Sequence, residues 1–302
     1  MTSPAPNASR GYGVAPAGYR LPDATHLGRV RLQVADLERS LAYYETVIGL
    51  RAVARTGDTA TLAAPSAGRA IVELHAKAGA QPMPHRGRIG LYHFAVLLPD
   101  RAALGRFVRH LEALGMRAGM SDHLVSEAVY LQDPDGLGIE VYADRPRPSW
   151  RVQERELAMT TAPLDVNGLV AAAGDEPWSG APPGTTLGHV HLYVRDLGEA
   201  AAFYHEGLGF DKIVWSYPGA LFMSAGGYHH HLGTNTWAAT APLTSPDDAR
   251  LLEWEILVPD RASANRAADS LEHHGFSVQR DGNDVVARDP WGTQVRVVPS
   301  GA

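Results

Sequence analysis

The chain has 302 residues, of which 45% are apolar and 20% charged, and its formal net charge is −6 at pH 7. This length supports about two domains with substantial cores. The acidic balance argues against a nucleic-acid partner. The sequence has no apolar run of membrane length, so it gives no indication of a membrane partner. The chain contains no cysteine, which excludes disulfides and thiolate ligands and favours a cytoplasmic location. Any metal site must therefore use histidines and carboxylates.

The N-terminal segment, residues 1–24, is rich in Pro, Gly, Ala and Ser. It lacks the apolar stretch that is typical of a secretory signal. We therefore expect residues 1–24 to form a flexible N-terminal arm.

An internal repeat organises the rest of the chain. Residues 27–50 return as 187–210, and residues 92–116 return as 252–276, both at an offset of 160 residues. In every copy an alternating apolar run, which predicts a strand, comes before an aspartate suited to cap an amphipathic helix. These aspartates are Asp36, Asp100, Asp196 and Asp260.

Short alternating runs follow each predicted helix and indicate further strands. They cover residues 59–63, 70–74, 128–131, 138–142, 219–223, 228–234, 284–288 and 293–298. The pattern is βαβββ written four times, an α+β fold with units near 26–77, 89–145, 186–237 and 250–300. We expect a first half at 25–145, a Pro-rich strap at 146–185 with a short helix near 164–174, and a second half at 186–302.

The sequence Asp-Pro-Asp-Gly at residues 133–136 predicts a tight turn between the last two strands of the second unit. The strand that follows carries Glu140 between Ile139 and Val141. A carboxylate in the middle of an apolar strand either points to solvent or holds a positive group.

Four such units, with histidines at unit starts and the motif DPDG-x-x-IE at a unit end, resemble the vicinal oxygen chelate superfamily. Within that superfamily the chain is similar to the two-domain extradiol catechol 2,3-dioxygenases, from about residue 27 to residue 298. The resemblance implies two pseudo-symmetric domains like those of glyoxalases and extradiol dioxygenases. Glyoxalases, epimerases and antibiotic-binding proteins share the pattern, so the fold alone does not give the function.

The resemblance also implies an Fe(II) site, with Mn(II) as the alternative metal, held by two histidines and one glutamate. The set that fits this pattern is His93, Glu140 and His189. Because these residues belong to the second and third units, we predict that unit 2 pairs with unit 3 and unit 1 with unit 4. The matching positions of units 1 and 4 are expected to hold a filled pseudo-site with an Arg–carboxylate pair, drawn from Arg29, Arg31, Glu253 and Arg296.

The same resemblance implies three further site residues. Tyr130 would donate a hydrogen bond to a substrate oxygen, and His123 would line the pocket, although the spacing between them is shorter than in better-known relatives. The family also uses an acid–base histidine at the end of the third unit, where residues 229–231 are all histidine. Neighbours in a strand alternate faces, and the match to the family favours His230, with His231 as the alternative.

These implications predict an extradiol dioxygenase that opens catechol or a substituted catechol with O2 to a 2-hydroxymuconic semialdehyde. The predicted partners are the catecholic substrate and O2, and a homo-oligomer is compatible with the sequence. One alternative is a glyoxalase-type metal-dependent isomerase or lyase, which usually needs a fourth protein ligand; that position would fall in the run 229–231. The other alternative is a non-catalytic small-molecule-binding or resistance protein, which would need no metal triad.

Overall fold

The computed structural model describes residues 11–65 and 69–301 of the chain. Its elements follow the four units. Unit 1 holds β1 (His26–Val34), α1 (Leu37–Tyr43), η1 (Tyr44–Ile48), β2 (Arg51–Thr56), β3 (Thr59–Ala63) and β4 (Ala70–Ala76). Unit 2 holds β5 (Gly90–Leu98), α2 (Arg101–Ala113), β6 (Gly119–Asp122), β7 (Ser126–Gln132) and β8 (Gly138–Asp144).

Unit 3 is entered through a connecting segment with η2 (Arg147–Ser149), β9 (Val152–Gln153), β10 (Glu156–Leu157) and α3 (Val166–Ala172). The unit itself holds β11 (Thr186–Tyr193), α4 (Leu197–Ala201), η3 (Ala202–Gly207), β12 (Asp211–Val214), β13 (Ala220–Ser224) and β14 (Leu232–Asn235). Unit 4 holds β15 (Arg250–Val258), α5 (Arg261–His273), β16 (Val278–Asp281), β17 (Asp284–Arg288) and β18 (Gln294–Pro299).

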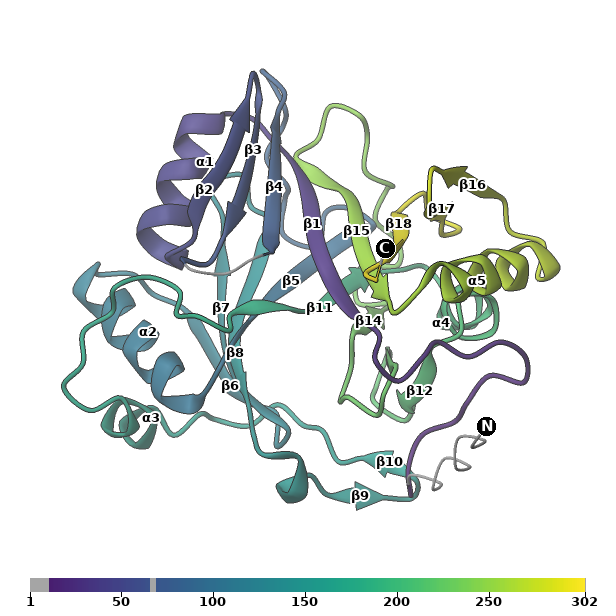
Figure 1. Ribbon diagram of the computed structural model, residues 1–302. Helices are drawn as coiled ribbons and strands as arrows, with labels where there is room; N and C mark the ends of the chain where they lie inside the picture. The colour runs from purple at the N-terminus through teal and green to yellow at the C-terminus, as the bar shows by residue number, and fades with distance from the viewer. Residues whose placement is uncertain (1–10, 66–68, 302) are drawn as a thin grey trace.

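The units pair across the chain and not in chain order. Within the described ranges, units 4 and 1 form one eight-stranded sheet, β16-β17-β18-β15-β1-β4-β3-β2. Units 3 and 2 form the other, β12-β13-β14-β11-β5-β8-β7-β6. Each sheet is joined at its centre by an antiparallel pair, β1 with β15 and β5 with β11, which lie side by side in Figure 1. The predicted α+β fold of two glyoxalase-like domains, with unit 2 paired to unit 3 and unit 1 to unit 4, is confirmed.

The four helices begin where the sequence predicted. Each capping aspartate accepts a hydrogen bond from the backbone N–H three residues later, which satisfies a donor that the helix leaves free. In units 1 and 3 the helix continues as a π-helical turn, η1 or η3. The chain then leaves through Gly49 and Gly209, whose φ values of 80° and 97° favour glycine.

The sequence did not predict six of the strands in the described residues. Two of them, β9 and β10, are two-residue strands of the strap. The other four, β2, β6, β12 and β16, are edge strands of the two large sheets. Every residue of β2 is exposed, so no apolar face marks it as a strand. An edge strand with both faces in water carries little of the alternation on which such predictions depend.

The strand predicted at 228–234 is shorter than expected, because β14 begins only at Leu232. Gly226 and Gly227 both have φ of 64° and turn the chain sharply after β13. The three histidines at 229–231 therefore lie in a loop, and strand alternation does not decide which of them faces the site.

The described part of the predicted flexible arm, residues 11–24, packs along the second half instead. Leu21 is buried, and the Arg20 guanidinium binds Asp211 through two hydrogen bonds of 2.7 and 2.5 Å. An apolar anchor and a bidentate ion pair hold this segment, which corrects the expectation of a flexible arm for these residues. Residues 1–10 of the arm lie outside the described part of the chain.

The strap at 146–185 contains the helix predicted near 164–174, which the structure places at α3. This helix packs on α2 so closely that a Cβ at Gly105 would lie 2.3 Å from the Leu169 carbonyl oxygen. The strap also runs beside β6, where Asp122 and Ala162 exchange two backbone hydrogen bonds. The strap thereby reaches the face of the second sheet that carries the predicted site.

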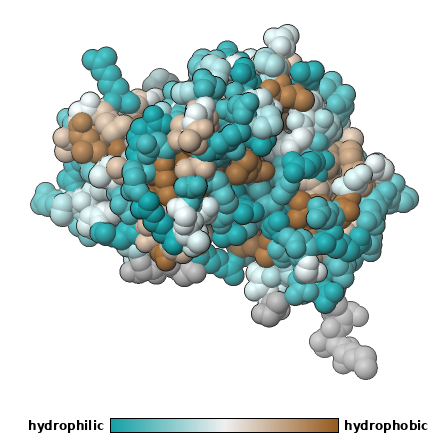
Figure 2. All heavy atoms as spheres, turned by 90° about the horizontal axis from the view of Figure 1, so that it is seen from above, coloured by the Kyte–Doolittle hydropathy of each residue, from teal (hydrophilic) through white to brown (hydrophobic). Residues whose placement is uncertain are grey.

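The face of the molecule in Figure 2 is largely hydrophilic, with apolar side chains in small separate groups. Among the described residues, no helix is long and apolar enough to span a membrane.

Candidate metal centre

Three side chains of the second sheet converge on one point. His93 Nε2 lies 3.0 Å from Glu140 Oε2, and His189 Nε2 lies 3.1 Å from the same oxygen. One donor atom from each of the three lies within 4.8 Å of the others, which the structure shows for no other such group in residues 11–65 and 69–301. The sequence-predicted triad is therefore brought together from two halves of the chain.

The register of the strands explains this convergence. β5 and β8 are parallel neighbours in which Ala95 pairs with Glu140. Ala95 lies two residues after His93 and shares its face, so Glu140 lies on that face too. β11 is antiparallel to β5 and sets His189 opposite Ala95. Three adjacent strands thus present their side chains on one face.

The triad is deeply buried, with exposed fractions of 4%, 2% and 1% for His93, Glu140 and His189. Burial lowers the pKa of both imidazoles, so they are neutral at pH 7. Burial also opposes ionisation of Glu140, but the contacts with His189 and His93 outweigh it and hold the pKa of this carboxyl well below its usual range. The pocket therefore offers two neutral nitrogen donors and one carboxylate.

The geometry fits a bound cation. His93 Nε2 is close to Glu140 but lacks hydrogen-bond geometry, and neither ring nitrogen of His93 has a hydrogen-bond partner in the described part of the chain. Buried polar atoms normally have partners. Neighbouring ligands of a six-coordinate ion with bonds of about 2.1 Å stand about 3 Å apart, which matches the two nitrogen–oxygen distances.

A cavity of about 360 Å³ opens beside the triad, a size typical of small-molecule sites. Its walls combine aromatic and apolar side chains with a few polar groups. Its lining includes Tyr92, His93, His123, Tyr130, Glu140, Met159, Thr160, His191, Phe222, His230 and Trp237.

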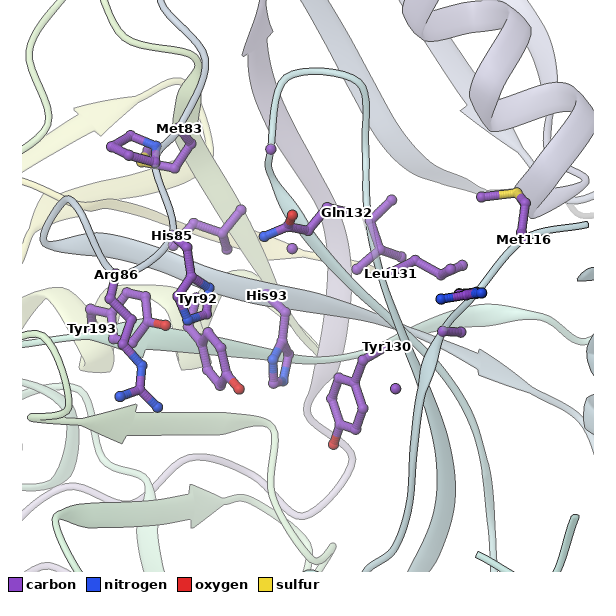
Figure 3. A pocket seen from close by; sticks show the side chains of 18 residues that line it. Met83, His85, Arg86, Tyr92, His93, Met116, Tyr130, Leu131, Gln132 and Tyr193 are labelled. Carbon is purple, nitrogen blue, oxygen red and sulfur yellow. The ribbon is translucent and has the colours of Figure 1, made fainter.

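Tyr92 faces this cavity because β5 carries a bulge. Leu91 pairs with Leu192 and His93 with His191, so Tyr92 is an extra residue without a partner in β11. Its ring centroid lies 4.6 Å from that of His93. Figure 3 shows the side chains of Tyr92, His93 and Tyr130 pointing the same way, beside a second cavity of about 580 Å³ that all three also line.

His123 and Tyr130 form a hydrogen-bonded pair at the edge of the cavity. His123 Nδ1 lies 2.6 Å from the Thr160 carbonyl of the strap, which can only accept, so Nδ1 carries a proton. In neutral His123, Nε2 then accepts from the Tyr130 hydroxyl at 2.6 Å. In this arrangement the Tyr130 proton points to His123; a doubly protonated His123 would free it for a substrate oxygen.

His230 is the member of the histidine run that lines the cavity. Its ring centroid lies 4.1 Å from that of His189 and 4.9 Å from that of Phe222. Burial among other histidines holds the pKa of His230 well below its usual range. His231 turns away, and its Nδ1 accepts from the backbone N–H of Ala225 at 3.2 Å.

The corresponding face of the first sheet carries a network of arginines and glutamates. Arg29 and Arg31 each bind Glu73 at 2.9 Å, and Glu253 lies 3.2 Å from Arg31 and 3.0 Å from Arg296. The expected Arg–carboxylate pairing is found, and it also includes Glu73, which the sequence reading missed.

The position related to Glu140 by the pseudo-symmetry of units 2 and 3 is a glycine. Ala95, two residues after His93, pairs with Glu140; His191, two residues after His189, pairs with Gly233. A Cβ at Gly233 would lie 2.9 Å from the His191 ring. The expectation that the fourth ligand position falls in the run 229–231 is therefore wrong, because β14 begins after these histidines.

Several cavity residues lay outside the sequence prediction. His191 lines the cavity, and its Nε2 lies 2.9 Å from Asn235 Nδ2. Met159 and Thr160 come from the strap, which no strand or helix pattern placed near the site. His191 shares the face of His189 by ordinary strand alternation. Met159 and Thr160 reach the cavity through the path of the strap, which leaves no periodic signal in the sequence.

Comparisons with known proteins agree with this architecture. Residues 26–141 and 186–297 match the family model "Glyoxalase/Bleomycin resistance protein/Dioxygenase superfamily". The chain is 44% identical over 270 residues to the catechol-2,3-dioxygenase of Bacillus subtilis (strain 168), which covers 88% of this chain and 94% of the relative.

Two solved structures share the fold. A Bacillus subtilis protein superposes with a TM-score of 0.64 at 16% identity, over 94% of this chain and 87% of that one. Glyoxalase I from Zea mays superposes with a TM-score of 0.55 at 19% identity, over 91% and 92%. The family model and the 44% identical relative together establish that the chain belongs to the glyoxalase/bleomycin resistance protein/dioxygenase superfamily, as the resemblance to the vicinal oxygen chelate proteins implied.

Proposed function

We propose that the protein is an extradiol dioxygenase that opens catechol or a substituted catechol with O2 to a 2-hydroxymuconic semialdehyde. The observation that carries the proposal is the buried trio His93, Glu140 and His189 at ligand spacing. His93 and Glu140 also line the small-molecule cavity. The 44% identical catechol-2,3-dioxygenase supports the same substrate class. Both oxygen atoms of O2 enter the product, so the reaction needs no further reductant.

His93, Glu140 and His189 would hold Fe(II), or Mn(II) as the alternative. Two histidines and one carboxylate on one face suit non-haem iron and leave open positions for substrate and oxidant. A metal held there would supply Lewis-acid binding positions for the substrate and for O2, which brings the two reactants together. Burial keeps both imidazoles unprotonated and available as donors.

The chain's own side chains then bind the ring and move protons. Phe222 and Trp237 contribute apolar walls that exclude water from the cavity. His230, beside His189, would take a proton from a catechol hydroxyl and return it later in the reaction. Tyr130 and His123 form the polar edge, where a substrate oxygen would meet either the hydroxyl or the imidazole.

The two alternative functions receive less support from the site. A glyoxalase-type isomerase or lyase usually needs a fourth protein ligand, and the position symmetric to Glu140 is Gly233, which has no side chain and no room for one. A non-catalytic binding or resistance protein has no requirement for His93, Glu140 and His189 at ligand spacing.

The test is aerobic turnover of a catechol panel by the Fe(II)-reconstituted protein, with metal content measured on the same sample. We expect one O2 consumed per catechol, together with a yellow ring-opened product. The variant His93→Gln should abolish turnover and reduce iron content. The matched control His75→Gln alters a histidine on β4 of the other sheet, and it should keep both. Absence of O2 uptake across the panel, with iron bound, would refute the proposal.

A further inference from the structure

A chain of hydrogen bonds leads from His230 away from the cavity to a carboxylate. His230 Nδ1 lies 2.8 Å from His229 Nδ1, and His229 Nε2 lies 2.8 Å from Asp144 Oδ1. Tyr228 also donates to Asp144 Oδ1, at 3.0 Å. His229 is completely buried, whereas the Asp144 side chain is 29% exposed.

The carboxylate of Asp144, at the end of this chain, sets the donor and the acceptor of each hydrogen bond in it. An ionised carboxylate only accepts, so His229 Nε2 carries a proton and donates it to Asp144. In neutral His229 the other nitrogen, Nδ1, is then an acceptor. It must receive its hydrogen bond from His230, so His230 carries its proton on Nδ1 and leaves Nε2 with a free lone pair.

We propose that Asp144 and His229 are positioning residues that hold His230 in the Nδ1–H tautomer and so keep its Nε2 available as the proton acceptor of the cavity. This inference rests on the proposed function, in which His230 takes the catechol proton. The logic is that of an Asp–His pair that fixes the tautomer of a catalytic base, here with one more imidazole in the chain.

The placement of Asp144 links this chain to the metal centre. Glu140, Tyr142 and Asp144 occupy alternate positions of β8 and therefore share a face. The Tyr142 and Tyr228 hydroxyls lie 2.6 Å apart. Because Tyr228 donates to Asp144, it accepts from Tyr142, so the tyrosines also end at the same carboxylate.

The alternative role of the hydrogen bonds to Asp144 is purely structural, in which they only hold the loop before β14 in place. Ser224 supplies a second anchor for the same loop, since its Oγ donates to the Tyr228 carbonyl at 2.6 Å. Ser224 touches neither Asp144 nor His229 through a hydrogen bond in the described structure. The variant Ser224→Ala is thus a control that loosens the loop and leaves the proposed relay in place.

The first experiment reads the tautomer directly and does not require turnover. The full chain, labelled with 15N in its histidines and loaded with Zn(II) as a diamagnetic probe, is examined by long-range 1H–15N correlation, with His230→Ala to assign the signal. We expect a protonated Nδ1 and an unprotonated Nε2 for His230. In Asp144→Asn the amide can donate to His229, which reverses both bonds, and we expect the Nε2–H tautomer of His230.

The second experiment measures catechol turnover by the Fe(II) form. Asp144→Asn should lower kcat about 100-fold, at the lower end of what general acid–base catalysis contributes, while the KM for catechol and the iron content change less than about threefold. Ser224→Ala should lower the unfolding temperature but keep kcat within about threefold. An equal loss of kcat in Asp144→Asn and Ser224→Ala would mean that the bonds to Asp144 only hold the loop in place, and it would overturn the proposal.

The outcomes separate this inference from the proposed function. An Nε2–H tautomer of His230 in the unaltered protein overturns the relay, whether or not catechol is turned over. An Nδ1–H tautomer without O2 uptake for any catechol refutes the dioxygenase proposal and the catalytic purpose of the relay together. An Nδ1–H tautomer that is lost in Asp144→Asn along with kcat supports both.

Discussion

The most direct test of the metal centre is the variant Glu140→Gln, followed through the effect of metal on stability. Gln keeps the size of the side chain but removes the anionic donor that both His93 and His189 approach at about 3 Å. Without metal, the change also removes a buried charge. The variant therefore separates a metal ligand from a carboxylate that merely accepts hydrogen bonds.

The expected magnitude follows from linkage. An ion at one hundred times its dissociation constant stabilises the folded protein by about 2.7 kcal/mol. At roughly 2–4 °C per kcal/mol for a protein of this class, this raises the unfolding temperature by about 5–10 °C. If loss of the carboxylate weakens affinity about 100-fold, the same ion concentration stabilises Glu140→Gln by only about 0.4 kcal/mol, or about 1 °C.

The assay is thermal unfolding with and without Mn(II), an air-stable stand-in for Fe(II), with bound metal measured after desalting. A matched control is Glu127→Gln, which alters an equally buried carboxylate on β7 held by Arg101 at 2.7 Å and by Arg145 at 3.2 Å. The control should unfold at a lower temperature but keep the full shift on adding Mn(II). A full shift in Glu140→Gln would refute the assignment of Glu140 as a ligand.

Three further predictions concern stability. Burial raises the pKa of Asp133 to about 7, so the folded protein retains a proton that the unfolded chain releases from roughly pH 4 upward. The stability of the unaltered protein therefore falls as the pH rises from about 4 to about 7. The melting temperature of Asp133→Asn should accordingly rise relative to that of the unaltered protein between pH 5 and pH 8. A constant difference over this range would contradict the pKa. Asp100→Ala removes the cap of α2 and should cost about 1 kcal/mol, whereas Asp100→Ser should restore most of it; equal melting temperatures for the two variants would contradict the cap. Gly188→Ala would place a Cβ 1.8 Å from the Tyr142 hydroxyl oxygen, so it should destabilise the fold by about 1–3 kcal/mol and reduce metal content, while Gly18→Ala, with open space around it, should do neither.

Much of the fold could be predicted from the sequence because local rules are repeated four times. Alternating runs, capping aspartates and terminal glycines mark the central strands and the helices, and their return at an offset of 160 residues identifies the units. The pairing of unit 2 with unit 3 was predictable because these two units together hold the two histidines and one glutamate that fit a metal site. The edge strand β2 was not predicted, because both of its faces lie in water and it has no apolar stripe.

The candidate site was predicted only in part, for reasons that lie outside local patterns. His93, Glu140 and His189 sit on regular strands, where residue type and register are visible in the sequence. Tyr92 faces the cavity because of a bulge, and Gly188 is an extra residue in β11 opposite β5. A bulge changes which side chains share a face of the sheet, but the apolar–polar pattern of the sequence does not reveal it.

The sequence by itself determined the four units, their caps and the residue types available to a metal. Those features depend on each residue's own backbone preference and polarity, which act over a few neighbours. Only the tertiary structure decided that the histidine run is a loop, that Gly233 occupies the position symmetric to Glu140, and that Asp144 stands behind His230. Each of these depends on which distant strands become neighbours and in what register, and that is fixed by the packing of the whole sheet.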